Sequence, residues 1–155
     1  IILSILKERK KCLGTGVDIS KNAIKLAKYN AKIQHIENRI KFFNSDIDNF
    51  CLDKYDLIIS NPPYIKLHKI NSLENDIKHH EPKEALDGGI DGYSKIKLVI
   101  KKSSSLIKKK GKLFLEVGSD QIMKTLEILK KYGFYKKDII KDLSNKNRCI
   151  VSIKI

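Results

Sequence analysis

The segment DLIISNPPYIK, residues 56–66, carries the most specific chemical signal in the sequence. Its apolar start predicts a strand, and the two prolines predict that this strand ends in a rigid turn, because proline cannot donate to a sheet and holds φ near one value. The residue before a proline is also restricted to extended backbone. We therefore expect the side-chain oxygen of Asn61 and the carbonyl of Pro62 to converge as two fixed acceptors, followed by Pro63 and by Tyr64 as an aromatic wall.

Two fixed acceptors suit a planar NH₂ group, because each takes one N–H and leaves the nitrogen facing an electrophile. Amide and arylamine nitrogens are poor nucleophiles, so a protein can help them mainly through orientation, proximity and electrostatics. The pattern itself implies no metal and needs no catalytic histidine. His79 and His80 are adjacent and lack ligand spacing, and we interpret them as loop residues. The competing interpretation is a plain Pro-Pro turn after a strand.

Two aspartates follow other predicted strands. Asp18 could accept hydrogen bonds from two ribose hydroxyls, or it could simply be an anion at the start of a helix capped by Ser20. Asp46 could accept from an adenine amino group while Ile47 covers the ring, or it could be a surface turn residue. Ligands of parallel α/β sheets bind beyond the carboxyl ends of the strands. We therefore expect Asp18, Asp46 and Asn61 at one edge of the sheet.

These positions depend on an alternation of helices and strands along the chain. The expected strands are CLGTGVDIS (ending near residue 18), RIKFFNSD, YDLIIS, GKLFLEVG, KDIIKDL and RCIVSIKI. Helices are expected over 1–11, on the apolar stripe 24/27/31, on the stripe 96/99/100/106, and over about 121–132. Alternating elements with continuously apolar strands predict one α/β domain over 1–155, with a doubly wound and mostly parallel sheet covered on both faces.

The glycines of LGTG, residues 13–16, resemble a nucleotide loop but have the wrong context. Such a loop follows a strand and precedes its acidic ribose partner by about 20 residues. Here the glycines follow a predicted helix and precede Asp18 by two residues. We expect them inside a strand, where they allow close backbone approach. If Asp18 is the ribose ligand, the nucleotide loop lies before Ile1.

The composition limits the class of protein. Of the 155 residues 41% are hydrophobic, and no apolar run approaches the ~18 residues of a membrane span, so we expect a soluble cytoplasmic protein. The net charge of +14 is mostly scattered lysine, and its densest run, IKKKGK at 107–112, is expected at a helix end, where cations favour the dipole. A basic surface for an RNA-bearing partner remains the alternative. The three cysteines lack paired spacing, which favours buried thiols over a disulfide or zinc site.

The strand-terminal NPPY resembles the signature of class I S-adenosylmethionine-dependent methyltransferases that act on planar nitrogen. The downstream segment HHEPKEALDGGIDGYSKIKLVI is similar to that of the HemK-type protein-(glutamine-N5) methyltransferases of peptide chain release factors, and so are GKLFLEVGSDQ and KDLSNKNRCIV. The resemblance spans essentially the whole chain. The residues that separate this branch from the others are Glu81, Pro82, Ala85, Leu86, Gly88, Gly89, Asp91 and Gly92.

The resemblance implies S-adenosylmethionine as cofactor and a release factor as protein substrate. It implies that Asp18 contacts the cofactor ribose, that Asp46 and Ile47 lie at the adenine, and that residues 61–64 hold the target glutamine. Many relatives carry an aromatic residue in place of Ile47. The family's glycine loop, first strand and amino-terminal helical domain do not occur in these 155 residues, so we expect the chain alone to fold poorly or to bind the cofactor weakly.

Two other functions stay open. One is an N6-adenine methyltransferase of DNA or RNA, which the positive charge favours and which predicts salt-dependent nucleic-acid binding. The other is a non-catalytic methyltransferase fold that docks on a translation factor. The sequence decides neither the preferred release factor nor the oligomeric state.

Overall fold

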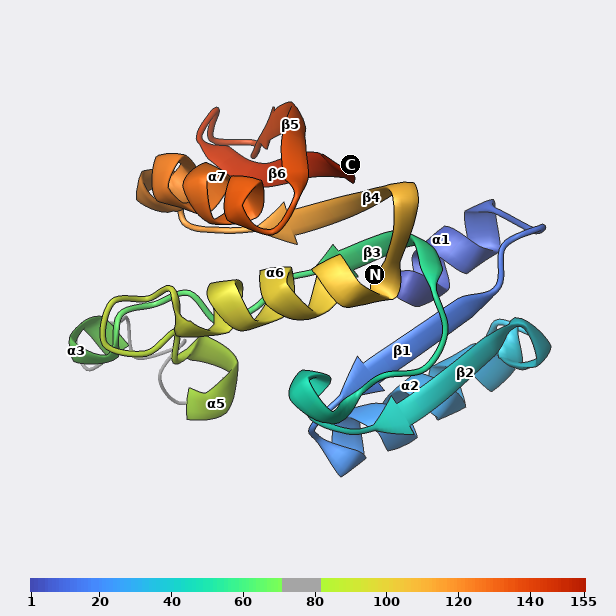
Figure 1. Cartoon of the computed structure of the whole chain (residues 1–155). Coiled ribbons are helices and arrows are strands. Elements are labelled where there is room, and N and C mark those ends of the chain that lie inside the picture. The colour runs from blue at the N-terminus through green and yellow to red at the C-terminus, as the bar shows by residue number, and fades with distance from the viewer. Residues whose placement is uncertain (71–81) are drawn as a thin grey trace. The chain divides into compact units, whose positions relative to one another are not determined.

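In the computed structural model, which describes residues 1–70 and 82–155, the chain forms two compact units, Ile1–Phe50 and Cys51–Ile155. Each unit combines helices with strands (Figure 1). Glu81, His79 and His80 lie outside the described residues.

The first unit is a parallel strand pair with two helices. Its elements are α1 (Ile2–Glu8), β1 (Gly14–Asp18), α2 (Lys21–Ile33), the 3₁₀ turn η1 (Glu37–Arg39), β2 (Ile40–Asn44) and the 3₁₀ turn η2 (Ile47–Asn49). Strands β1 and β2 run parallel, with Asp18 in register with Asn44. The predicted cap is confirmed, because the Ser20 side chain accepts from the backbone N–H of Ala23 at 3.2 Å.

The glycines of β1 are strand residues, as the sequence predicts. A Cβ at Gly14 would lie 2.9 Å from a methyl carbon of Leu6, and one at Gly16 would lie 2.6 Å from the ring of Phe42. Both glycines therefore let neighbouring apolar side chains approach the β1 backbone closely.

The second unit is a four-stranded sheet with two long helices. Its elements are β3 (Tyr55–Ser60), α3 (Leu67–Ile70), α5 (Lys83–Leu86), α6 (Ser94–Leu106), β4 (Ile107–Glu116), the 3₁₀ turn η3 (Ser119–Gln121), α7 (Ile122–Lys131), β5 (Phe134–Lys141) and β6 (Asn147–Lys154). The strand order is β3-β4-β6-β5. Strand β4 pairs parallel with β3, and β6 pairs antiparallel with both β4 and β5. Strands β3, β4 and β5 thus share one direction, which confirms the prediction of an α/β fold with a mostly parallel sheet.

The core of the second unit lies between this sheet and the helices α6 and α7. Leu113 and Leu115 of β4 belong to the same buried cluster as Ile96 and Ile100 of α6, and all four side chains are fully buried. The predicted stripe of α6 is therefore its buried face. This core fixes the end of β4, next to which the candidate site lies.

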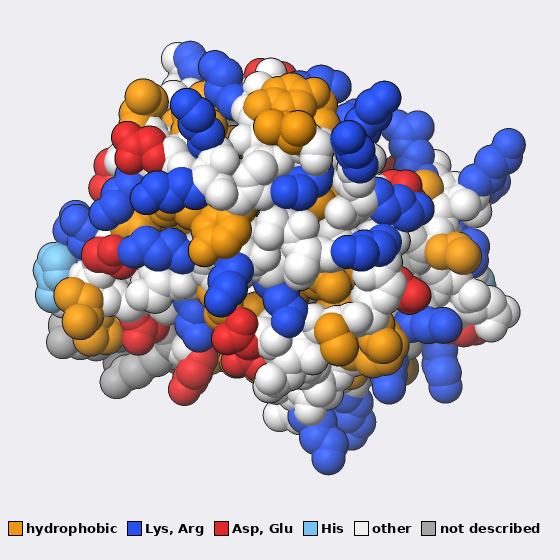
Figure 2. Space-filling view, in the orientation of Figure 1, with side chains coloured by type: hydrophobic (Ala, Val, Ile, Leu, Met, Phe, Trp, Pro, Cys, Tyr) orange, Lys and Arg blue, Asp and Glu red, His pale blue; other side chains and the backbone are white. Residues whose placement is uncertain are grey.

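Two predictions from composition are corrected by the structure. The run IKKKGK does begin directly after the end of α6 at Leu106, but it forms the first six residues of β4, where Lys108 pairs with Asp56 at 2.9 Å. Lysine and arginine side chains are interspersed with other types over the face drawn in Figure 2.

The prediction that the cysteines are buried thiols is wrong. Cys12 and Cys51 are exposed, and only Cys149 is partly buried, where burial raises the pKa of its thiol. Within the described residues, no group of three or more His, Cys, Asp or Glu side chains could hold a metal ion, and no helix is long and apolar enough to cross a membrane.

Candidate active site

The NPPY loop, residues 61–64, leaves the carboxyl end of β3. Pro62 is buried, whereas Asn61 is exposed. Within the described part of the chain, neither the Asn61 side chain nor the Pro62 carbonyl has a hydrogen-bond partner. Both groups that the sequence predicts as acceptors are therefore available to a ligand at this strand end.

The backbone after the NPPY loop is pinned by the glycine segment, residues 86–92. The N–H of Ile65 donates to the carbonyl of Leu86 at 3.2 Å, and the N–H of Gly88 donates back to the carbonyl of Ile65 at 2.9 Å. One residue further on, the N–H of Leu67 donates to the carbonyl of Gly89 at 3.0 Å. The glycine segment thus holds the backbone that follows the NPPY loop in place.

This contact requires a glycine at position 88. A Cβ there would lie 2.8 Å from both the Cα and the carbonyl carbon of Tyr64, and 3.0 Å from the Cα of Gly92. Backbone atoms cannot move aside as a side chain can, so any larger residue would separate the two segments.

The turn of the glycine segment is stabilised by two aspartates. Asp87 accepts from the N–H of Gly89 at 2.7 Å, and Asp91 accepts from the N–H of Tyr93 at 2.9 Å. Asp91 also pairs with Lys97 at 3.0 Å. The hydrogen bond from Tyr93 and the charge of Lys97 lower the pKa of Asp91, so its carboxylate is charged at neutral pH.

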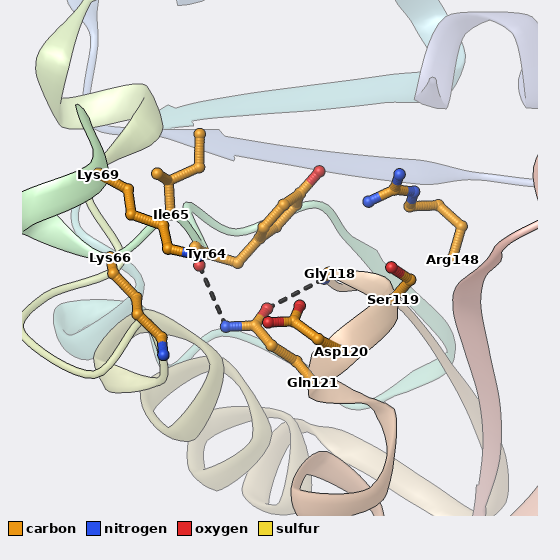
Figure 3. A pocket seen from close by; sticks show the side chains of 9 residues that line it. All are labelled: Tyr64, Ile65, Lys66, Lys69, Gly118, Ser119, Asp120, Gln121 and Arg148. Carbon is orange, nitrogen blue, oxygen red and sulfur yellow. Dashed lines mark hydrogen bonds between the residues drawn. The ribbon is translucent and has the colours of Figure 1, made fainter. Parts of the chain in front are cut away.

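The Tyr64 ring is held at its hydroxyl. The hydroxyl lies 3.5 Å from a carboxylate oxygen of Glu116, at the end of β4, and points toward the guanidinium of Arg148 (Figure 3). Arg148 is anchored by Asp142 at 3.3 Å. Burial raises the pKa of Tyr64, so the phenol stays protonated and neutral near pH 7. An aromatic wall of fixed orientation results.

A cavity of about 200 Å³ opens beside Tyr64 (Figure 3). Its wall combines the tyrosine with the cationic side chains of Lys66, Lys69 and Arg148 and with Asp120. All of these residues belong to the second unit. The cavity thus places charged and polar side chains beside the tyrosine.

Asp18 ends β1 in the first unit. Its Oδ1 accepts from the N–H of Ser20 at 2.8 Å, while its Oδ2 has no partner among the described residues. The backbone is fixed by Asn44, whose side-chain N–H groups donate to the carbonyls of Asp18 at 3.1 Å and Ile19 at 2.7 Å. An exposed carboxylate with a free oxygen fits a ligand that offers hydroxyl donors.

Asp46 and Ile47 follow the neighbouring strand β2. Asp46 caps the turn η2 by accepting from the N–H of Asp48 at 3.1 Å, and its carboxylate is exposed. Ile47 is half-buried and leaves part of its side chain accessible. The surface-turn interpretation of Asp46 and the adenine interpretation are both compatible with this geometry.

The structure brings the predicted residues together within each unit. Asp18 and Asp46 follow adjacent parallel strands of the first unit, and Asn61 and Tyr64 share one loop of the second. That Asp18, Asp46 and Asn61 lie at one common edge stays a prediction.

Sequence reasoning assigned no role to Gln121, Glu116 or Arg148. The only local signal at Gln121 is its spacing of three residues after Gly118, which is half of a capping box, and the Gln121 side chain does accept from the N–H of Gly118 at 3.0 Å. Glu116 and Arg148 gave no local signal, because they lie far from Tyr64 in sequence and approach it only in the folded sheet.

Residues 1–138 match the model of a protein family described as methyltransferase small domain. The chain is 34% identical over 152 residues to the release factor glutamine methyltransferase of Rhodospirillum rubrum, covering 98% of this chain and 47% of that protein. It is 31% identical to the enzyme of the same name from Agrobacterium fabrum, covering 97% of this chain and 52% of that protein. The chain thus spans about half the length of the curated relatives it matches.

Solved structures share the fold at low sequence identity. A methyltransferase from Pyrococcus furiosus superposes with a TM-score of 0.70 at 15% identity, over 99% of this chain and 68% of that one. TrmN from Thermus thermophilus gives a TM-score of 0.60 at 16% identity, over 91% of this chain and 36% of that one. These similarities support the Rossmann-like class I methyltransferase architecture.

Proposed function

Because the chain belongs to the methyltransferase small domain family, we propose that it transfers a methyl group from S-adenosylmethionine to the side-chain amide nitrogen of a glutamine in a peptide chain release factor. The relatives that match nearly the whole chain carry the name of this activity. The observation that carries the proposal is the exposed Asn61 side chain, which has no hydrogen-bond partner among the described residues, beside a backbone-pinned Tyr64. Since release factors act at the ribosome, the proposal places the protein in the cytoplasm.

The NPPY loop would hold the target amide through two hydrogen bonds. The Asn61 side-chain oxygen and the Pro62 carbonyl each accept one N–H, and the ring of Tyr64 restricts the amide plane. The two prolines restrict the backbone that carries these acceptors before the substrate arrives, so less backbone ordering is needed on binding. The amide nitrogen would form a bond to the methyl carbon as the carbon–sulfur bond of the sulfonium breaks, leaving a neutral thioether, and the proton that the nitrogen loses would go to water.

The residues of the first unit fit the cofactor by their donor and acceptor chemistry. The free Oδ2 of Asp18 suits ribose hydroxyls, and Asp46 with Ile47 suits the amino group and the face of an adenine. S-adenosylmethionine supplies an electrophilic methyl group on a sulfonium centre when bound.

A nucleic-acid substrate is the competing proposal, and the net charge of +14 is the observation that favours it. An adenine amino group is also planar and could be held by the same two acceptors. Phosphate contacts would make such binding fall steeply with salt. On the face that Figure 2 draws, lysine and arginine side chains are interspersed with other types.

The test is methyl transfer by the protein expressed from its complete gene. We expect incorporation of labelled methyl into a purified release factor and none into the variant whose target glutamine is alanine. Incorporation into DNA or RNA but not into the release factor would contradict the proposal. Salt titration of any nucleic-acid binding separates the two substrates.

A further inference from the structure

We propose that Gln121 is a positioning residue for the methyl-accepting loop. Its side-chain amide fixes the peptide carbonyl of Tyr64, and through the rigid prolines it fixes the acceptors at Asn61 and Pro62. The expected effect of Gln121 on turnover rests on the proposed function, whereas its expected effect on the position of the loop does not.

The Gln121 amide joins three segments that are far apart in the sequence. Its Nε2 donates to the carbonyl of Tyr64 at 3.1 Å and to the carbonyl of Gly92 at 3.1 Å. Its Oε1 accepts from the N–H of Gly118 at 3.0 Å. Figure 3 shows the amide lying between Tyr64 and Gly118, below the cavity. The NPPY loop, the glycine segment and the end of β4 are thus tied to one side chain.

The bonds of Gln121 have no substitute in the described part of the chain. No other described group donates to the carbonyl of Tyr64 or of Gly92. Gln121 itself is only 3% exposed, so water cannot readily replace it. A buried carbonyl without a donor is costly, and the loop would move to reach solvent.

The glycines around the Gln121 amide leave the space that it occupies. Gly92 has φ of +77°, and a Cβ there would lie 2.9 Å from Nε2 of Gln121 and 2.8 Å from the carbonyl oxygen of Tyr64. A Cβ at Gly118 would lie 2.9 Å from Oε1 of Gln121. Gly92 and Gly118, which frame the amide, therefore cannot carry a side chain without displacing it.

Gln121 acts through Tyr64 and does not touch the substrate. Both N–H groups and the oxygen of its amide are already engaged within the protein, so none is free for a ligand. Because Pro62 and Pro63 have nearly fixed φ, a rotation of the Tyr64 peptide is transmitted to Asn61. A misplacement of about 1 Å at reacting groups can reduce rate roughly 10²-fold.

Two substitutions separate positioning from general stability. Gln121→Met keeps the volume but removes both donors. Gln121→Glu places a carboxylate against two carbonyl oxygens, and burial raises the pKa of such a group, so that acid converts it to a neutral donor. Glu127→Gln, on the exposed side of α7, is the matched control.

Turnover and cofactor affinity are measured on the protein expressed from its complete gene. We expect Gln121→Met to lower kcat roughly 10²-fold while KM for the methyl donor changes by less than about threefold. Gln121→Glu should regain activity, relative to wild type at the same pH, as the pH falls from about 9 to about 6. Wild-type kcat in Gln121→Met, or a Gln121→Glu to wild-type ratio that does not change with pH, would overturn the positioning role.

Hydrogen exchange tests the loop without any assumption about the substrate. The amides of Ile65 and Gly88 should exchange faster in Gln121→Met than in wild type and in Glu127→Gln, while the core amides of β4 keep their protection. Uniformly faster exchange across the second unit, or no change at Ile65 and Gly88, would contradict the inference. If wild type methylates no release factor, the proposed function fails, and this exchange measurement still decides on Gln121.

Discussion

The Asp18 strand end and the NPPY loop belong to units that are stabilised to different extents. In Ile1–Phe50 the apolar cluster contains four buried residues, whereas the cluster of the described part of Cys51–Ile155 contains thirteen. The carbonyls next to Asp18 are held by the amide of Asn44, but the backbone beside Tyr64 is held by the glycine segment and by Gln121. We therefore expect the second unit to present a preformed acceptor for the target nitrogen, and the first to become more ordered when it binds the cofactor.

Removing the Asn61 amide tests the second unit most strongly. Asn61→Ala deletes one of two acceptors at an exposed position, so the fold should be unaffected while turnover falls roughly 10²-fold or more. Cofactor affinity, measured by calorimetry, should stay within about threefold of wild type. Asn22→Ala, on the exposed side of α2, is the control. Equal losses of turnover and cofactor affinity would assign Asn61 to the cofactor instead.

Adding one methyl group at a glycine compares the two units directly. Gly88→Ala places a Cβ against the Tyr64 backbone, and we expect a loss of about 1–3 kcal/mol in the free energy of unfolding, together with reduced turnover. Gly16→Ala meets only the ring of Phe42, which can rotate, so its loss should be smaller. Denaturant unfolding of both variants measures the difference, and a larger loss for Gly16→Ala would reverse the comparison.

Much of this architecture could be predicted from the sequence because its signals are local. The end of the apolar strand at Ser60 before the two prolines, the Ser20 cap and the apolar stripe of α6 each follow from residues close in sequence, and all are confirmed. Gln121 could not be assigned in this way, because its role depends on Tyr64 and Gly92, which reach it only through the fold. Position relative to a strand end, more than residue type, decides which polar groups remain free.

The lysine run and the cysteines show why composition predicts less well. Helix α6 ends at Leu106 and strand β4 begins at Ile107, with no glycine or proline between them. A shift of one residue in this boundary therefore decides whether a lysine lies at the helix end or in the strand. Cys12 and Cys51 lie in exposed irregular segments, so the general preference of thiols for the interior did not apply.

Asp18→Asn tests the first unit with a smaller expected effect. The substitution keeps the Oδ1 that accepts from Ser20 but removes the charge, so the strand end should retain its structure. Charge-assisted hydrogen bonds to ribose hydroxyls would be weakened, and cofactor affinity should fall about tenfold. Unchanged cofactor affinity in a calorimetric titration would mean that Asp18 serves only as an anion near the N-terminus of α2.

Protonation of Asp91 in acid should destabilise the glycine segment. Near neutral pH we expect no change in its stability. The pKa of Asp91 lies below its ordinary 3.8 because Tyr93 and Lys97 favour the charged form. Its stabilisation is therefore fully present above that ordinary value and is lost as the pH falls through the lower pKa of the folded protein. Hydrogen exchange at Tyr93, corrected for its intrinsic pH dependence, should show constant protection between about pH 5 and 8. A loss of protection within that range would contradict this assignment.

The most direct test of the account is to identify the atom that receives the methyl group. A release factor with ¹⁵N-labelled glutamine side chains is treated with ¹³C-methyl S-adenosylmethionine and the protein expressed from its complete gene, and the product is examined by heteronuclear NMR. We predict a one-bond ¹³C–¹⁵N coupling on a single glutamine side chain, reduced in rate by Asn61→Ala. A methyl group on any other atom of the release factor, or transfer at wild-type rate by Asn61→Ala, would contradict the claim that the NPPY loop holds a planar amide.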